Sequence, residues 1–323
     1  MPSSPLLRYA LAGAFAILTA LIVCIIPACL AKPEAVPNGT RTTLNVAYVP
    51  GGGVRQQMDV YAHPNPDAPV LVWIHGGGWL GGSKERCPLL GLMAQGYSVV
   101  SINYRYSFST NSKDGKSNKG EPEVHTFPAQ LQDCKAAIRY IRAHAKELGL
   151  NTKRIGAVGA SAGGHLVALL GVTGTIRTFD VGENLDQSSA VDLVVNAVGP
   201  TDIFWYADYS NKDVQYMADK LIGGPIKDNR ARADAASPVH YVKPGAAIPP
   251  ILNLYGGKDP LVPAEQGRLF DKALRDAGAS STLIVNPDTG HDLSPAAAIA
   301  AWAFIRKHLP PAAAAATPGS SAK

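Results

Sequence analysis

From about residue 43 onward, short apolar runs alternate with stretches in which apolar residues have the spacing of helices. The apolar runs predict buried strands at residues 69–75, 98–104, 154–160, 191–198, 250–255 and 282–285. Helices are predicted at residues 164–170, 264–277 and 294–309 and between Pro128 and Gly149. Two alternating runs, residues 43–49 and 56–62, predict an antiparallel pair before them. Buried strands separated by helices are typical of an α/β domain with a mostly parallel sheet and helices on both faces.

Two segments interrupt this alternation. Residues 107–126 form a polar stretch rich in Lys, Asn, Ser and Gly, which is long for a connection without secondary structure. Residues 201–248 lie between two predicted strands and hold several aromatic side chains. This second segment is long enough for a small cap or side wall over the carboxyl-terminal edge of the sheet, where open α/β sheets bind ligands.

The two ends of the chain differ from the region between them. Arg8 is the one charged side chain before Lys32, and residues 11–26 are almost entirely apolar. Residues 1–31 are therefore predicted to be a secretory signal peptide, so that the protein is exported. Two alternatives stay open, a lipoprotein modified at Cys29 and an uncleaved membrane anchor. Residues 32–309 suffice for one large catalytic domain, and residues 310–323 are predicted to be a disordered tail.

Composition argues against several classes of function. The net charge is +5 without a dense run of Lys or Arg, so nucleic acid is not an expected partner. No zinc pattern, Walker motif or dinucleotide fingerprint is present, so neither a metal nor a cofactor is expected. Cys87 and Cys134 follow the leader. Cys134 has the helical spacing of a buried apolar residue, and a disulfide between the two cysteines is the alternative.

The strand predicted to end near residue 160 runs into the sequence Gly-Ala-Ser-Ala-Gly at residues 159–163. A serine between two glycines at a strand-to-helix turn is the pattern of a nucleophile elbow. Side chains at the flanks of so sharp a turn would collide, which explains the glycines. The pattern predicts that the hydroxyl of Ser161 projects above the edge of the sheet as a nucleophile.

A serine nucleophile needs a base, and the base needs an acid that holds its tautomer. His291 follows the last predicted strand, so it opens onto the same edge as the elbow, and it is the expected base. Asp259 follows the preceding strand and is the expected acid, which puts the three residues in the order Ser, Asp, His. His165 lies too close to the serine on the helix that leaves the elbow.

The developing negative charge of an attacked carbonyl needs preorganised N–H donors. Residues 75–79 have the sequence His-Gly-Gly-Gly-Trp directly after a predicted strand. The backbone N–H groups of Gly77, Gly78 and Ala162 are the expected oxyanion donors, and His75 is expected to orient the glycine loop. Trp79, Trp205 and Tyr206 are candidates for substrate binding, and a place in the core is equally compatible with their sequence. Asp202 fits a helix cap better than a pocket position.

Together these motifs resemble the α/β-hydrolase esterases of the hormone-sensitive-lipase-like clan, closest to bacterial feruloyl and acetylxylan esterases. The resemblance covers about residues 54–309 and is carried by residues 75–79, 127–134, 159–165, 199–202, 259–263 and 290–291. It implies a serine carboxylesterase that acts on short-chain or aryl esters, including feruloyl or acetyl esters of carbohydrates, through an acyl-enzyme. Small-molecule or polysaccharide esters are then the expected partners, and a membrane is expected only if the leader is lipidated or retained.

Two rival functions share this scaffold. A formamidase or other amidase of the same fold would use the same triad. A binding protein without catalysis would normally lack a member of the triad, and this sequence supplies all three. The 107–126 segment is longer than the connection expected in the family, which leaves the size of the substrate open.

Overall fold

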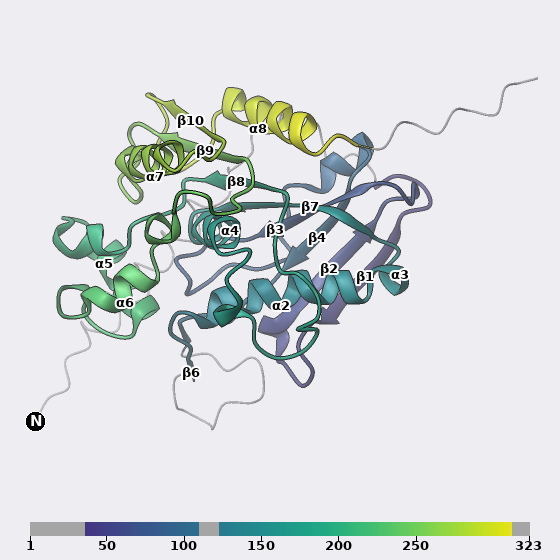
Figure 1. Cartoon of the computed structure of the whole chain (residues 1–323), viewed down its shortest axis with the longest axis horizontal. Coiled ribbons are helices and arrows are strands. Elements are labelled where there is room, and N and C mark those ends of the chain that lie inside the picture. The colour runs from purple at the N-terminus through teal and green to yellow at the C-terminus, as the bar shows by residue number, and fades with distance from the viewer. Residues whose placement is uncertain (1–35, 110–122, 312–323) are drawn as a thin grey trace, which may run out of the picture.

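The computed structural model describes residues 36–109 and 123–311. Its centre is an eight-stranded sheet with the order β1-β2-β4-β3-β7-β8-β9-β10 (Figure 1). All pairs from β4 to β10 are parallel, and β1 and β2 add two antiparallel strands at one edge. The strands are β1 Arg41–Ala47, β2 Gln57–Ala62, β3 Pro69–Ile74, β4 Ser98–Ile102, β7 Asn151–Ala160, β8 Leu193–Ala197, β9 Ile251–Gly256 and β10 Ser281–Asn286. The predicted mostly parallel sheet is confirmed.

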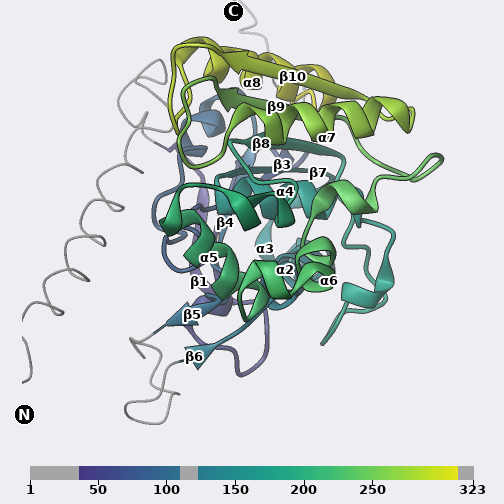
Figure 2. The ribbon, with the colours of Figure 1, turned by 90° about the vertical axis from the view of Figure 1, so that its left-hand side faces the viewer.

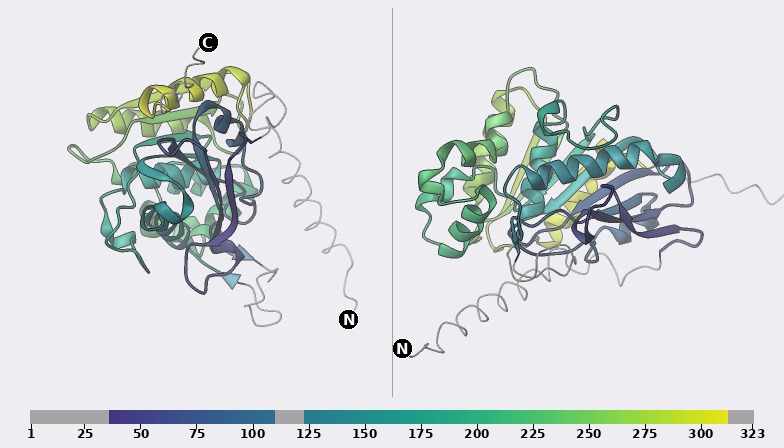
Figure 3. Two further views of the ribbon diagram at one scale, coloured as in Figure 1. Left: turned by 90° about the vertical axis from the view of Figure 1, so that its right-hand side faces the viewer. Right: turned by 90° about the horizontal axis from the view of Figure 1, so that it is seen from below.

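Helices cover both faces of this sheet, which explains why its strands are apolar without alternation. Val70 and Val72 of β3 belong to the same core cluster as side chains of α2, α4 and α7, whereas Leu71 and Trp73 belong to a second cluster with α8. Helix α8 lies over the end of the sheet formed by β8 to β10, away from β1 and β2 (Figure 3). These helices are α2 Ala129–Ala143, α4 Ala162–Val172, α7 Ala264–Asp276 and α8 Pro295–His308.

The segment at residues 201–248, expected to be a cap or side wall, is helical in the structure. It holds α5 Lys212–Ile222, α6 Arg230–Ala235 and the short 3-10 helices η4 Phe204–Asp208, η5 Ile226–Asp228 and η6 Pro238–Tyr241. Helices α5 and α6 lie together at one end of the sheet (Figure 2). Asn211 caps α5 by accepting hydrogen bonds from the first-turn N–H groups, and Gly223 ends the helix in the left-handed conformation.

The structure divides one predicted helix into two and adds a short hairpin that was not predicted. The helix expected between Pro128 and Gly149 is interrupted at His144 and continues as the short α3, Ala145–Leu148. Gly149 ends it with a φ of 71°, as a left-handed cap. The ends of the 107–126 segment pair as a short hairpin of β5 Phe108–Ser109 and β6 Glu123–Val124.

Several predictions fall on residues that the structure does not describe. These are the leader at residues 1–31, the middle of the 107–126 segment and most of the tail. Cys134 is described and fully buried, as expected. It is unpaired, as is Cys87, so the alternative of a disulfide between them is wrong.

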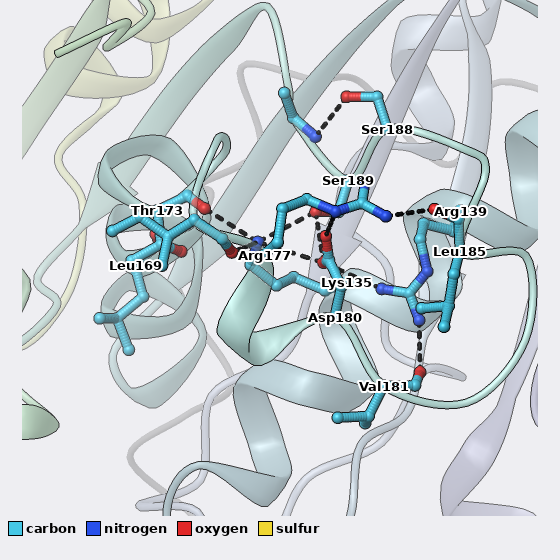
Figure 4. Close-up of polar contacts among 12 residues, drawn as sticks. Lys135, Arg139, Leu169, Thr173, Arg177, Asp180, Val181, Leu185, Ser188 and Ser189 are labelled. Atoms are coloured by element: carbon cyan, nitrogen blue, oxygen red, sulfur yellow. Dashed lines mark hydrogen bonds and ion pairs between the residues drawn. The ribbon is translucent and has the colours of Figure 1, made fainter.

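A buried polar network attaches the segment between α4 and β8 to helix α2 (Figure 4). Asp180 Oδ1 lies 3.3 Å from Lys135 Nζ and 3.0 Å from Arg139 Nη1, and Ser189 Oγ donates to it at 2.8 Å. Lys135 also donates to the carbonyl of Thr173 at 2.8 Å. Burial lowers the pKa of Lys135, and the charge of Asp180 opposes that effect. One buried carboxylate therefore compensates two fully buried cations.

Candidate active site

Ser161 lies in a strained turn between β7 and α4. Its backbone has φ 56° and ψ −123°, a conformation that L-residues rarely adopt and that costs about 1–3 kcal/mol. A Cβ atom on Gly159 would lie 2.3 Å from the carbonyl oxygen of Gly163, and one on Gly163 would lie 2.0 Å from that of Ile74. The turn therefore requires glycine on both sides, as predicted from the sequence.

Backbone hydrogen bonds hold the elbow in place. The N–H of Ser161 donates to the carbonyl of Ala197 on β8 at 2.8 Å, and the Ser161 carbonyl accepts from His165 at 3.0 Å. Ala162 is the first residue of α4, where helical N–H groups have no partner within the helix. The positive end of the helix dipole therefore lies beside the serine.

Asp259 and His291 meet at the same edge of the sheet. Asp259 follows β9 and His291 follows β10, and these strands are parallel neighbours. His291 Nδ1 and Asp259 Oδ2 are 2.7 Å apart, and the aspartate side chain is fully buried. The other oxygen, Oδ1, accepts from the backbone N–H groups of Leu261 at 2.8 Å and Val262 at 2.9 Å. These two bonds fix the carboxylate so that Oδ2 faces the imidazole, which leaves Nε2 of His291 available as a base.

Six of the nine site residues predicted from the sequence line one cavity of about 50 Å³. Its chemically active side is lined by Gly77, Gly78, Ser161, Ala162 and His291. Its apolar side is lined by Trp79, Pro200, Val214, Met217, Leu261 and Val262. The structure therefore brings the predicted nucleophile, base and oxyanion donors together.

The glycine loop after β3 has an unusual backbone path. Gly77 and Gly78 have φ values of 119° and 59°, and Trp79 follows at 59°. A Cβ atom on Gly77 would lie 2.3 Å from the carbonyl oxygen of Gly81. The two glycines are needed both for these angles and for the close approach of the backbone. Trp79 also adopts a left-handed conformation, although it lacks the conformational freedom of glycine. Its surroundings must therefore stabilise this conformation.

His75 holds the start of this loop. Its Nδ1–H donates to the carbonyl of Gly76 at 2.8 Å, and its Nε2 accepts from Arg55 Nη2 at 3.0 Å. Its ring is stacked on Tyr104, with the ring centroids 4.4 Å apart. Burial, with a smaller contribution from Arg55, lowers the pKa of His75 to about 3. The ring is therefore neutral at ordinary pH, and Arg55 is a supporting residue that sequence reasoning missed.

His165 holds the end of the loop. Trp79 Nε1–H donates to His165 Nδ1 at 3.2 Å, and His165 Nε2–H donates to the carbonyl of Ala236 at 2.7 Å. Burial lowers the pKa of His165 to about 4. Both ring nitrogens are occupied, so this histidine is unavailable as a base for Ser161. It instead connects the glycine loop, helix α4 and the end of helix α6.

The other aromatic candidates lie elsewhere. Tyr206 is fully buried and Trp205 packs on it, with ring centroids 5.5 Å apart. Neither side chain is among those that line the cavity. Asp202 caps the turn that carries them, because its Oδ1 accepts from the N–H of Trp205 at 3.2 Å. The apolar wall is instead supplied by Met217 and its neighbours, which the sequence pattern did not single out.

Two negative observations concern the described residues, 36–109 and 123–311. Within them, no three or more His, Cys, Asp or Glu side chains are grouped so that they could hold a metal ion. In the same ranges, no helix combines the length and the apolar character needed to cross a membrane.

The order of these parts defines the class of protein. A serine at a strand-to-helix turn, followed along the chain by an acid and a histidine after later strands of one parallel sheet, is the arrangement of an α/β-hydrolase. Comparison with protein families then identifies the branch. The BD-FAE family model matches residues 58–274, and the chain belongs to this family.

Known proteins resemble this chain at moderate identity. Esterase LipQ of Mycobacterium tuberculosis is 31% identical over 264 residues, which cover 77% of this chain and 56% of that protein. A truncated carbohydrate esterase from gut microbiota is 29% identical with a TM-score of 0.65, covering 78% of this chain and 89% of that chain. A bifunctional GH43-CE protein of Bacteroides eggerthii is 29% identical with a TM-score of 0.70. The match covers 82% of this chain and 38% of that chain. The chain spans about half the length of the curated relatives it matches.

Proposed function

We propose that this protein is a serine carboxylesterase that works through an acyl-enzyme on Ser161. The observation that carries the proposal is the 2.7 Å contact of Asp259 with His291, together with the shared cavity of His291 and Ser161. A histidine oriented in this way leaves Nε2 to accept the serine proton. Relatives named as esterases support the same class of reaction.

The reaction follows from the positions of these groups. His291 Nε2 takes the proton of Ser161 Oγ while that oxygen bonds to the ester carbonyl carbon. The carbonyl oxygen becomes an oxyanion, which the N–H groups of Gly77, Gly78 and Ala162 stabilise. The tetrahedral intermediate then collapses, the C–O bond to the alcohol breaks, and His291 returns the proton to the departing oxygen. Water, deprotonated by the same imidazole, hydrolyses the acyl-enzyme and regenerates the serine.

The cavity supports an apolar acyl group, because Trp79, Val214 and Met217 line it together with Ser161. Short acyl chains, from acetyl to butyryl, are the proposed substrates. The carbohydrate esterase among the structural relatives supports an ester of a saccharide as one natural substrate. The alternative of a formamidase predicts that N-formyl amides are hydrolysed faster than any ester.

The first experiment replaces the nucleophile. Ser161→Ala is expected to lower kcat for p-nitrophenyl acetate by about 10⁶-fold, because the base then has no nucleophile to activate. A fluorophosphonate probe is expected to add one mass label to the wild type and none to this variant. Ser188→Ala, at an exposed serine, is the matched control. Normal turnover by the folded Ser161→Ala variant would refute the proposal.

We also propose that the protein is exported, because residues 1–31 have the composition of a signal peptide. The expected mature protein begins near Lys32. Intact-mass measurement of protein expressed from the full-length gene distinguishes this product from a lipid-modified chain beginning at Cys29 and from an uncleaved chain.

A further inference from the structure

We propose that Met217 on helix α5 is the specificity-determining residue that limits the length of the acyl chain. This inference rests on the proposed function, since it assigns the acyl side of the Ser161 cavity. Met217 belongs neither to the proposed triad nor to the glycine loop. It lies in the helical segment at residues 201–248.

The side chain of Met217 packs directly on Gly78 of the glycine loop, residues 75–79. A Cβ atom placed on Gly78 would lie 2.1 Å from Met217 Sδ and 3.1 Å from its Cγ. The thioether therefore covers the face of Gly78 so closely that not even a methyl group fits between them. Because the N–H of Gly78 is an expected oxyanion donor, Met217 stands beside the place of the substrate carbonyl.

The position of His291 decides which half of the ester faces Met217. His291 must return a proton to the departing alcohol oxygen, so the alcohol lies on its side of Ser161. Leu261 and Val262, the residues bonded to the triad aspartate, line that cavity together with His291. The carbonyl oxygen faces the N–H of Gly78, so the acyl chain takes the remaining direction, along the apolar side of the cavity to which Met217 belongs.

Helix α5 is anchored firmly enough to act as a wall. Tyr209 Oη and Asn211 Nδ2 both donate to the carbonyl of Pro260, at 3.0 and 3.2 Å. Pro260 directly follows the triad residue Asp259, so the start of the helix is attached to the loop that positions the base. Its buried side chains, Val214, Ala218, Leu221 and Ile222, pack into the core and anchor the helix. A change at Met217 therefore alters the cavity and leaves the helix in place.

The length of the acyl chain decides whether it reaches this wall. An acetyl group has one carbon beyond the carbonyl, whereas an octanoyl chain has seven and is expected to meet Met217, which lines the cavity. Shortening Met217 to alanine removes three heavy atoms from that wall. One methylene in an apolar pocket changes kcat/KM by about 10-fold to 200-fold, so the effect is large enough to measure.

The test measures kcat/KM for p-nitrophenyl acetate, butyrate and octanoate, which vary the acyl chain while the alcohol stays the same. Met217→Ala is expected to raise the octanoate-to-acetate ratio by at least about 10-fold. Met217→Phe, which enlarges the side chain, is expected to lower the butyrate-to-acetate ratio. Met217→Leu preserves volume and is expected to change neither ratio by more than about 3-fold.

A control variant on the same helix and a series of alcohols test whether the effect is specific to Met217 and to the acyl chain. Tyr216→Ala changes an exposed side chain on the same helix that is not among those lining the cavity, and it is expected to leave the acyl ratios unchanged. A series of acetate esters with alcohols of increasing size is expected to give the same relative rates for Met217→Ala and the wild type.

Two results would overturn the inference. One is an unchanged acyl ratio in both Met217→Ala and Met217→Phe, and the other is an altered preference for the alcohol instead. Either result leaves the proposed function intact as long as activity still depends on Ser161. Activity that survives Ser161→Ala would instead remove the proposed function, so the two failures are distinguishable.

Discussion

Acidification is expected to destabilise this protein steeply, because the two histidines that hold the glycine loop are buried in the neutral form. An unfolded chain protonates a histidine near pH 6.5. In the folded protein burial lowers the pKa of His75 to about 3 and that of His165 to about 4. Between pH 6.5 and pH 4 the unfolded state therefore binds more protons than the folded state. The contribution of the neutral rings to stability is complete above pH 6.5 and declines as the pH falls below it.

The size of this effect follows from the two pKa values. Each histidine reduces the free energy of unfolding by about 1.4 kcal/mol for each pH unit below 6.5, until its folded pKa is reached. At pH 4.5, two units below, the loss is about 3 kcal/mol for each ring and about 5–6 kcal/mol for both. A typical domain has about 5–15 kcal/mol of stability, so this loss alone consumes a large share of it.

Urea unfolding at pH 7.0 and pH 4.5 measures this loss, and His165→Gln separates the contribution of one ring. Glutamine can accept from Trp79 Nε1–H and donate to the carbonyl of Ala236, and it has no proton to gain. The variant is expected to lose about 3 kcal/mol less than the wild type between the two pH values. His240→Gln, at an exposed histidine, is the matched control. An unchanged acid loss in folded His165→Gln would refute the assignment of a buried neutral ring.

Three further substitutions test the triad, the elbow and the buried network. Asp259→Asn is expected to lower kcat by about 10⁴-fold with an unchanged melting temperature, because the amide favours the wrong tautomer of the histidine. Gly163→Ala is expected to cost about 3 kcal/mol in urea unfolding, since its Cβ would meet backbone oxygens. Gly81→Ala, with 3.7 Å to the nearest atom, is its control. Asp180→Asn is expected to cost about 3–5 kcal/mol in the same assay.

Each of these expectations has an outcome that contradicts it. Near-normal turnover by Asp259→Asn would mean that another group orients the base. Equal stability of the two glycine variants would mean that the elbow relaxes around an added methyl group. A neutral effect of Asp180→Asn would mean that water or backbone carbonyls compensate Lys135 and Arg139 without the carboxylate.

The strands, and the meeting of Ser161, Asp259 and His291 at one edge of the sheet, were predictable because both depend on local order along the chain. Apolar runs without alternation indicate strands buried on both faces, and the parallel order of those strands places the residues that follow them at one edge. Ser161, Asp259 and His291 are separated widely in the sequence, yet each follows such a strand. Gly159 is likewise determined locally, because its Cβ would meet the carbonyl of Gly163 within the same turn, whereas Gly163 is required because β3 brings the carbonyl oxygen of Ile74 beside it.

The supports and the walls of the site depended on the tertiary structure. Arg55 reaches His75 from a distant segment, and His165 meets Trp79 across the sheet edge; neither contact leaves a periodic signal. The sequence was equally compatible with substrate binding and a core position for Trp205 and Tyr206, and the packing of residues 201–248 places them at the core and Met217 at the cavity. The sequence by itself determined the sheet, the order of Ser161, Asp259 and His291 along the chain, and the glycine in the elbow before the serine. Only tertiary packing decided which apolar side chains enclose the cavity, because many apolar residues are interchangeable until neighbouring elements assign each one a face.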